Sequence, residues 1–260
     1  MIVCKSPGEI EKMRAANALV AEVLAELAAM VAPGVSTRDL DVVAERLVRE
    51  GGAEPAFKGY RGYPATLCAS VNDQVVHGIP SNRPMNEGDI LSLDMGVKLN
   101  GFYGDSAVTV GVGRIGDDAQ RLLRVTQEAL ERGIRQVRVG GRISDIGHAV
   151  QLHVESHGFS VVREFVGHGI GVALHEEPQI ANYGEPGRGP RMVEGMVFAI
   201  EPMVNMGRPA VKVLADGWTA VTRDGSLSAH FEHTVAVTKN GPDVLTMRPS
   251  TVGTNENGRA

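Results

Sequence analysis

Apolar residues recur at helical spacing through the first fifty positions of the chain and again near its middle. Residues 6–9 read Ser-Pro-Gly-Glu, which supplies the Ser, the early Pro and the acid of a helix start, and the Ala- and Leu-rich run that follows extends to Met30. A second helix is predicted from residue 36 or 37 to the Gly-Gly pair at 51–52. Helical spacing predicts two more, over 117–138 and from about 144 to 157, before short β-rich runs begin at 161.

Two apolar runs, 90–99 and 102–110, flank Asn100-Gly101, the strongest short-range signal for a two-residue β-hairpin. If Leu99 pairs with Phe102, Asp94 and Asp105 share one face of the sheet as diagonal neighbours, about 7–8 Å apart at the backbone. One or two cations would fit between such carboxylates. The alternative is that each aspartate caps a turn or pairs with a lysine.

The second half of the sequence repeats the first. Residues 87–90 (Glu-Gly-Asp-Ile) match 194–197 (Glu-Gly-Met-Val) at an offset of 107, which also carries Asp94 onto Glu201. If the two units pack about an approximate two-fold axis, their acid-bearing strands meet, with Asp94, Asp105, Glu201 and Glu232 around one centre. Buried unpaired carboxylates cost several kcal/mol each, so with His168 these residues are five potential metal ligands.

The repeat favours one duplicated domain spanning residues 1–260, with 250–260 as a polar tail. The chain has 260 residues and is 43% hydrophobic, which is enough for a large core. Its net charge of -5 offers no basic footprint for nucleic acid. The cysteines, Cys4 and Cys68, argue against a disulfide framework. No signal-peptide core and no stretch approaching eighteen apolar residues is present, so a soluble cytosolic protein is expected.

Several histidines and glycines allow two interpretations. Residues 167–171 read Gly-His-Gly-Ile-Gly and resemble a phosphate-binding loop, but no strand-then-helix context accompanies them, so the glycines are better explained as letting the backbone crowd a metal-bound His168. His153 and His157 have the i, i+4 spacing that zinc sites use, yet the metalloprotease order is missing, and we expect them on a solvent-exposed helix face. His77 and His175 lie in turn-rich segments, where a functional role and an ordinary surface position are both open.

Three strings carry a family resemblance. Residues 71–80 read Val-Asn-Asp-Gln-Val-Val-His-Gly-Ile-Pro, 167–178 run from Gly-His-Gly-Ile-Gly to His-Glu-Glu-Pro, and 231–234 read Phe-Glu-His-Thr. Within a similarity that runs from Ser6 to about Thr246, they resemble type I methionine aminopeptidase, in particular bacterial members without an N-terminal extension. The resemblance implies a pita-bread fold of the α+β class, with internally duplicated halves and an antiparallel sheet flanked by helices.

The resemblance also assigns roles to the candidate residues. It implies two divalent ions (Co, Mn, Fe or Zn) held by Asp94, Asp105, His168, Glu201 and Glu232. Glu201 would also shuttle a proton, while His175 would stabilise the oxyanion and His77 would contact the scissile amide nitrogen. A pocket for methionine is implied at Tyr60, Tyr63, Cys68 and Trp218. Departures from the family occur at Phe57 and Leu174, near this pocket, and at His230, which replaces a common Gln beside Glu232.

The implied activity is removal of the initiator methionine from nascent proteins and peptides with a small second residue, by attack of a metal-activated water on the scissile carbonyl. We expect a cytoplasmic monomer whose partners are nascent N-termini and peptides, met in transient association with the ribosome, without nucleic acid or membrane. Two alternatives stay open. A prolidase or aminopeptidase P shares the metal fold but usually carries a large additional N-terminal domain. A catalytically inactive protein of this fold would bind peptides or RNA, but all five ligands are present and the net charge is negative.

Overall fold

The structure, a computed structural model, describes residues 2–247, so the predicted tail at 250–260 lies outside the described residues. The helices are α1 (Pro7–Met30), α2 (Thr37–Glu50), the 3₁₀ helix η1 (Tyr60–Gly62), α3 (Asp117–Ile134) and α4 (Ile143–Ser156). The strands are β1 (Glu54–Pro55), β2 (Cys68–Val71), β3 (Gln74–Val76), β4 (Ile90–Leu99), β5 (Phe102–Gly111), β6 (Ser160–Val161), β7 (Gly167–Gly169), β8 (Glu176–Ile180), β9 (Val197–Ile200), β10 (Met203–Asn205), β11 (Val211–Val213), β12 (Ala220–Thr222), β13 (Ser228–His230), β14 (His233–Thr238) and β15 (Gly241–Val244).

The four predicted helices are confirmed, and the starts of α1 and α2 follow from local capping. Ser6 and Glu9 form a reciprocal capping box at α1, and Ser36 and Asp39 form another at α2. Helix α3 ends at Ile134, earlier than the predicted 138, because the chain tightens there into a turn that still buries the next apolar side chain. Among residues 2–247, none of the helices is both long enough and apolar enough to cross a bilayer.

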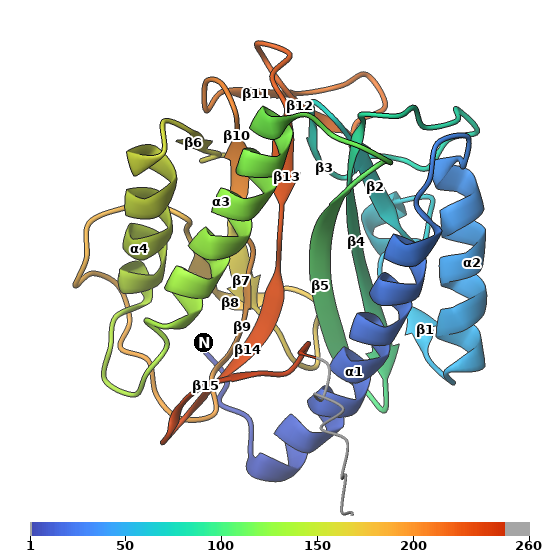
Figure 1. Ribbon diagram of the computed structural model, residues 1–260. Coiled ribbons are helices and arrows are strands. Elements are labelled where there is room, and N and C mark those ends of the chain that lie inside the picture. The colour runs from blue at the N-terminus through green and yellow to red at the C-terminus, as the bar shows by residue number, and fades with distance from the viewer. Residues whose placement is uncertain (1, 248–260) are drawn as a thin grey trace, which may run out of the picture.

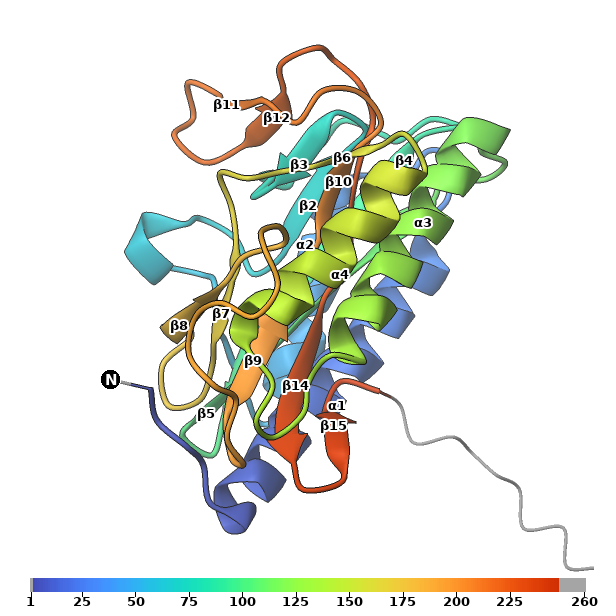
Figure 2. The same cartoon turned by 90° about the vertical axis from the view of Figure 1, so that its left-hand side faces the viewer.

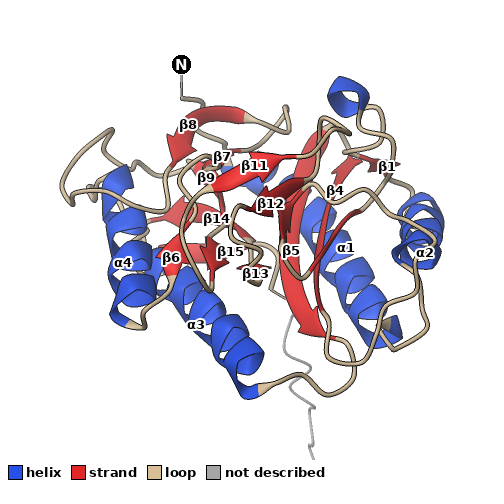
Figure 3. Cartoon of the chain, turned by 90° about the horizontal axis from the view of Figure 1, so that it is seen from above, coloured by secondary structure: helices blue, strands red, loops and turns tan. Residues whose placement is uncertain are grey.

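The helices stand in two pairs with the strands between them. Seen from above, α1 and α2 lie on one side and α3 and α4 on the other (Figure 3). Helix α1 packs on β4 and β5, and α3 packs on β5, β9, β10 and β13 (Figure 1). Strands β8 and β11 project on the opposite side of the molecule from α3 (Figure 2). The halves therefore have matching layers, as the sequence repeat predicted.

The hairpin of β4 and β5 pairs in the predicted register. Leu99 lies opposite Phe102, and the ladder continues without a slip to Ile90 opposite Gly111. Asn100 and Gly101 both have positive φ (53° and 83°), which a type I′ turn requires at its two central residues. The Asn-Gly turn thus determines which face of the sheet each aspartate occupies.

Strand β5 also joins the two halves. The backbones of Ala107 and Glu232 form an isolated antiparallel bridge, and the Ser106 hydroxyl donates to the Glu232 carbonyl over 2.7 Å. The Thr109 hydroxyl donates to the His230 carbonyl, also over 2.7 Å. Buried hydrogen bonds of this kind hold the acid-bearing strands of the two halves at a defined separation.

Each half has its own hydrophobic core. One core lies under α1 and α2 and includes Leu40 and Leu93, while the other lies under α3 and α4 and includes Ile146 and Phe198. All four side chains are fully buried. The matching pairs of helices therefore stabilise the central strands from two independent apolar surfaces.

Leu40→Ala is expected to lower the free energy of unfolding by about 2–5 kcal/mol, because it opens a cavity where α2 meets the first core. The matched control is Leu152→Ala on α4, where the side chain is 63% exposed and the change should stay within about 0.5 kcal/mol. Urea unfolding followed by circular dichroism measures both. Equal losses for the two variants would show that the first core is not packed as described.

Candidate metal centre

One cavity of about 160 Å³ collects every site residue predicted from the sequence. It opens between the joined strands of the two halves and the loops that carry η1 and β8. The lining residues are Phe57, Tyr60, Arg61, Tyr63, Cys68, His77, Asp94, Asp105, His168, Leu174, His175, Glu201, Trp218 and Glu232. Arg61 also lines the cavity, although it is not among the residues singled out from the sequence.

Asp94 and Asp105 enter the cavity from the hairpin. Asp94 lies opposite Ala107, and Asp105 lies opposite Gly96, two positions along the ladder, so both point from the same face. Their exposures are 9% and 3%. The diagonal arrangement predicted from the sequence is therefore what the strands provide.

His168 enters from β7 with its imidazole orientation fixed. Its Nδ1–H donates to the Gly169 carbonyl over 2.9 Å, so Nε2 is the free lone pair. Nε2 lies 3.6 Å from Glu201 Oε1 and 3.8 Å from Asp105 Oδ2. A Cβ on Gly169 would collide with the carbonyl of Glu177, so a glycine at this position allows β7 and β8 to approach closely.

The second half contributes the remaining acids. Glu201 directly follows β9, and Glu232 lies between β13 and β14, at the bridge to β5. Asp105, His168 and Glu232 each offer a ligand atom within 4.8 Å of the other two. A carboxylate and imidazole set at this spacing matches what divalent transition metals use.

Burial makes these carboxylates hard to ionise on their own. Desolvation raises the pKa of Asp94 to about 7, and it raises the pKa values of Asp105, Glu201 and Glu232 well above their usual range, with repulsion among the four acids adding to the effect. Among the described residues, Asp94 Oδ1, Asp105 Oδ1 and Glu232 Oε1 are buried without a hydrogen-bond partner. Cations would satisfy these oxygens and offset the repulsion, so the residues fit a metal centre.

His175 and His77 lie at the margin of this acid cluster. His175 Nδ1 is 2.9 Å from the Tyr60 hydroxyl, and its ring lies against that of His168 with centroids 4.2 Å apart. His77 has a φ of 60°, in the left-handed region that non-glycine residues seldom adopt. Its ring meets the rings of Phe165 and Trp218 edge to face. Burial lowers the pKa of His77 to about 4, so the ring is neutral at pH 7.

An apolar wall of three side chains lines part of the cavity. The rings of Tyr63 and Trp218 meet edge to face at 5.1 Å, and Cys68 packs with them. The Tyr63 hydroxyl donates to the carbonyl of Gly78 over 2.9 Å, which fixes the ring. Leu174, one of the departures from the family, is also buried and lines the same cavity.

His230 and Arg61 add features that the sequence did not define. His230 is 2% exposed, and neither ring nitrogen has a hydrogen-bond partner among the described residues. Burial lowers its pKa to about 3, so it is a neutral ring 3.7 Å from Glu201 and not an added charge. The Arg61 guanidinium lies over the Tyr60 ring at 5.4 Å. In the sequence, the only indication of a functional position for Arg61 is its place between Gly59 and Gly62, and both of these glycines have positive φ in the structure.

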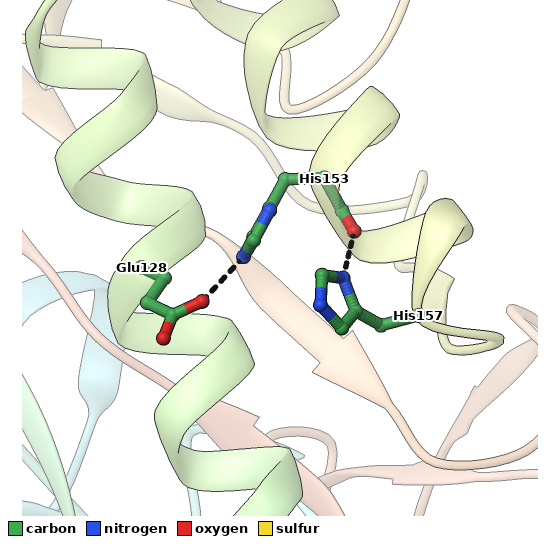
Figure 4. Close-up of side chains that lie close together, drawn as sticks. All are labelled: Glu128, His153 and His157. Carbon is green, nitrogen blue, oxygen red and sulfur yellow. Dashed lines mark hydrogen bonds and ion pairs between the residues drawn. The ribbon is translucent and has the colours of Figure 1, made fainter.

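His153 and His157 do not lie on a solvent-exposed face, so that prediction was wrong for His153 and holds only in part for its neighbour. His153 is 6% exposed, and its Nε2 lies 2.9 Å from a Glu128 oxygen on α3, while His157 is half-buried beside it (Figure 4). The i, i+4 pair points inward because α4 turns this face toward α3. Single-helix periodicity does not reveal such contacts between helices.

Known proteins resemble the chain over nearly its full length. Residues 11–239 match the profile of Metallopeptidase family M24. Methionine aminopeptidase 1 of Bacillus subtilis is 54% identical over 246 residues, covering 95% of this chain and 99% of the relative. The crystal structure of methionine aminopeptidase from Thermotoga maritima superposes with a TM-score of 0.94 at 48% identity, covering 95% of this chain and 100% of that one. Prolidase from Pyrococcus furiosus superposes with a TM-score of 0.77 at 22% identity, covering 95% of this chain and 66% of that one, which is a likeness of fold.

Proposed function

The chain belongs to metallopeptidase family M24 and, within it, to the methionine aminopeptidases. From this premise we propose that its site removes the N-terminal methionine of peptides and nascent proteins with a small second residue. The pita-bread fold expected from the sequence is confirmed by the solved structures from Thermotoga maritima and Pyrococcus furiosus. The observation that carries the proposal is the meeting, in one cavity, of an acid-rich ligand set, two neutral histidines and an apolar wall.

Asp94, Asp105, His168, Glu201 and Glu232 would hold two divalent ions. Ions in such a site supply Lewis acidity and make a water nucleophilic near neutral pH. The ligand set suits Mn, Fe, Co or Zn and does not choose among them. Orphaned oxygens on Asp94, Asp105 and Glu232 support the assignment, since each needs a cation or a donor.

Glu201 is proposed to accept the proton that leaves the attacking water and to pass it to the departing amine. One of its oxygens faces His168, and the other lies 3.7 Å from His230 Nε2. Burial raises the pKa of Glu201 well above its usual range, and bound cations would lower it again. A carboxylate between these influences can take and release a proton near neutral pH.

His175 is proposed to donate a hydrogen bond to the developing oxyanion. When the Tyr60 hydroxyl donates to Nδ1, the imidazole proton is on Nε2 and points away from Tyr60. Burial, followed by the charge of Arg61, lowers the pKa of His175, which keeps this donor neutral at pH 7. His77, held by Phe165 and Trp218, is proposed to contact the amide nitrogen side of the scissile bond.

The size of the cavity favours an exopeptidase that takes one side chain. Its volume of about 160 Å³ is about half that of the smaller pockets that bind drug-sized ligands, ~300 Å³. The wall of Tyr63, Cys68 and Trp218, together with Tyr60, would receive the methionine thioether, because aromatic rings and sulfur attract each other by about 0.3–1.5 kcal/mol. Nascent N-termini would be met in the cytoplasm by a monomer in transient association with the ribosome.

Release of free methionine from Met-Ala-Ser, compared with hydrolysis of an X-Pro peptide, tests the proposed function. The proposal expects the first to be much faster. Preference for the X-Pro bond would assign the chain a prolidase-like activity, and the absence of both reactions in metal-loaded protein would favour an inactive binding protein.

His77→Ala is expected to lower turnover of Met-Ala-Ser by about 10²–10⁴-fold, the usual effect of losing a positioned proton-transfer or hydrogen-bonding group. The metal content should remain that of the wild type, because His77 is assigned to the substrate and not to the ions. Elemental analysis beside the rate measurement checks this, and stoichiometric loss of metal would mean that His77 is a ligand.

A further inference from the structure

A second set of metal-ligand side chains lies outside the cavity described above, between α3 and α4. Glu128 comes from α3, His153 comes from the last turns of α4, and His157 caps the end of that helix (Figure 4). Each offers a ligand atom within 4.8 Å of the other two. Ligands around a zinc ion are about 3.4 Å apart when each bond is about 2.1 Å. The ligand atoms would therefore have to move closer together on binding, and Glu128 can make such a movement because its side chain is 43% exposed.

The orientation of His157 is not explained by a simple ion pair. A hydrogen bond of 2.9 Å from His153 Nε2 to Glu128 accounts for those two residues. His157 is held separately, because its Nδ1–H donates to the His153 carbonyl over 2.8 Å. This contact leaves Nε2 as a lone pair, and Figure 4 shows that nitrogen on the side of the ring facing Glu128. Metal-binding histidines are commonly oriented by donating their other N–H to a backbone carbonyl.

The surroundings give an ion access from the surface. Both histidines border a surface cavity of about 690 Å³ that Arg132 and Arg135 also line. Burial, and then the charge of Arg132, lowers the pKa of His153, so the imidazole is neutral and able to coordinate at pH 7. The negative charge of Glu128 offsets part of the charge of an ion. Water or a small anion from the arginine-lined cavity can occupy the fourth tetrahedral position.

We propose that Glu128, His153 and His157 form a second, structural site for an imidazole-preferring divalent ion such as Zn²⁺, which clamps α3 to α4. On binding, the ion takes the position of the Nε2 proton of His153, and that proton moves to Nδ1, so the ring stays neutral. The hydrogen bond to Glu128 is replaced by coordination of both side chains. The hard ions Mg²⁺ and Ca²⁺, which prefer oxygen ligands, are excluded by the two imidazoles.

Zinc stoichiometry tests the site independently of the activity. The full-length protein is stripped of metal, loaded with Zn²⁺, dialysed and analysed for zinc per chain. The wild type is expected to hold one equivalent more than Glu128→Gln and His157→Gln. The matched control is His148→Gln, which removes a histidine of the same helix that borders the same cavity but lies outside the cluster, and it should keep the wild-type count.

Thermal unfolding tests the site even if a variant is destabilised, because the shift in Tm caused by zinc is compared between variants. Excess Zn²⁺ should raise the Tm of the wild type and of His148→Gln more than that of Glu128→Gln or His157→Gln, because only the first two retain the clamp. Turnover of Met-Ala-Ser by all variants should be unchanged. Equal zinc counts and equal Tm shifts in the wild type and the cluster variants would overturn the proposal, as would loss of the extra equivalent in His148→Gln.

Discussion

Asp105→Asn is expected to lower turnover of Met-Ala-Ser by more than about 10³-fold, the scale on which losing one member of a catalytic unit acts. The side chain keeps its size and loses the charge that a cation needs. Glu232→Gln should behave in the same way, because Glu232 reaches the same point from the other half of the fold. Initial rates at saturating Mn²⁺ or Co²⁺ measure the effect.

The Asp105→Asn protein should remain folded. In the metal-free state the pKa of Asp105 is raised by burial and by the neighbouring acids, so a neutral amide relieves repulsion. Its thermal unfolding in a chelator should therefore occur at or above the wild-type temperature. The matched control is Asp118→Asn, an exposed acid in the first turn of α3, which should leave the rate unchanged. Full activity of Asp105→Asn would remove this carboxylate from the metal centre.

Met-Lys-Ser is expected to be cleaved more than about 100-fold more slowly than Met-Ala-Ser. A long second side chain would clash with the rim formed by Tyr60 and His175, and steric clashes can reject a substrate more strongly than a missing methylene, worth about 1–3 kcal/mol. A lysine would also bring its charge toward the exposed guanidinium of Arg61. Met-Leu and Met-Phe peptides should be poor substrates for the steric reason alone.

A tripeptide panel measures this selectivity, with Met-Gly-Ser and Met-Ser-Ser as further good substrates. Comparable rates for Met-Ala-Ser and Met-Lys-Ser would contradict the rim. Leu-Ala-Ser separates the rim from the methionine pocket, because it keeps a small second residue and changes only the first. If it is cleaved as fast as Met-Ala-Ser, the wall of Tyr63, Cys68 and Trp218 does not select methionine.

The parts of the site that depend on short-range rules could be predicted from the sequence. Asn100-Gly101 specifies a two-residue turn, and the period of two along a strand then places Asp94 and Asp105 on one face. The repeat indicated that Glu201 would meet them, because duplicated units pack with matching strands together. The roles of His77 and His175, at the margin of the acid cluster, could be assigned only from the family resemblance.

Features that depend on contacts between distant segments could not be predicted. The loop that places Arg61 at the rim has no periodicity, and the ring of His77 packs against Phe165 and Trp218, which are far away in the sequence. His153 was misplaced because its burial depends on α3, not on its own helix. Local sequence patterns predict which face of a helix or strand is apolar, but not which other element packs against that face.

Methionine release from Met-Ala-Ser, measured during removal and return of metal, tests the central claim most directly. Exhaustive chelation should abolish the activity, and it should return on titration with Mn²⁺ or Co²⁺ in proportion to the ions bound at Asp94, Asp105, His168, Glu201 and Glu232. The double variant Glu128→Gln/His157→Gln should give the same titration, which separates this centre from the site between α3 and α4. Full activity in the demetallated protein would contradict the account.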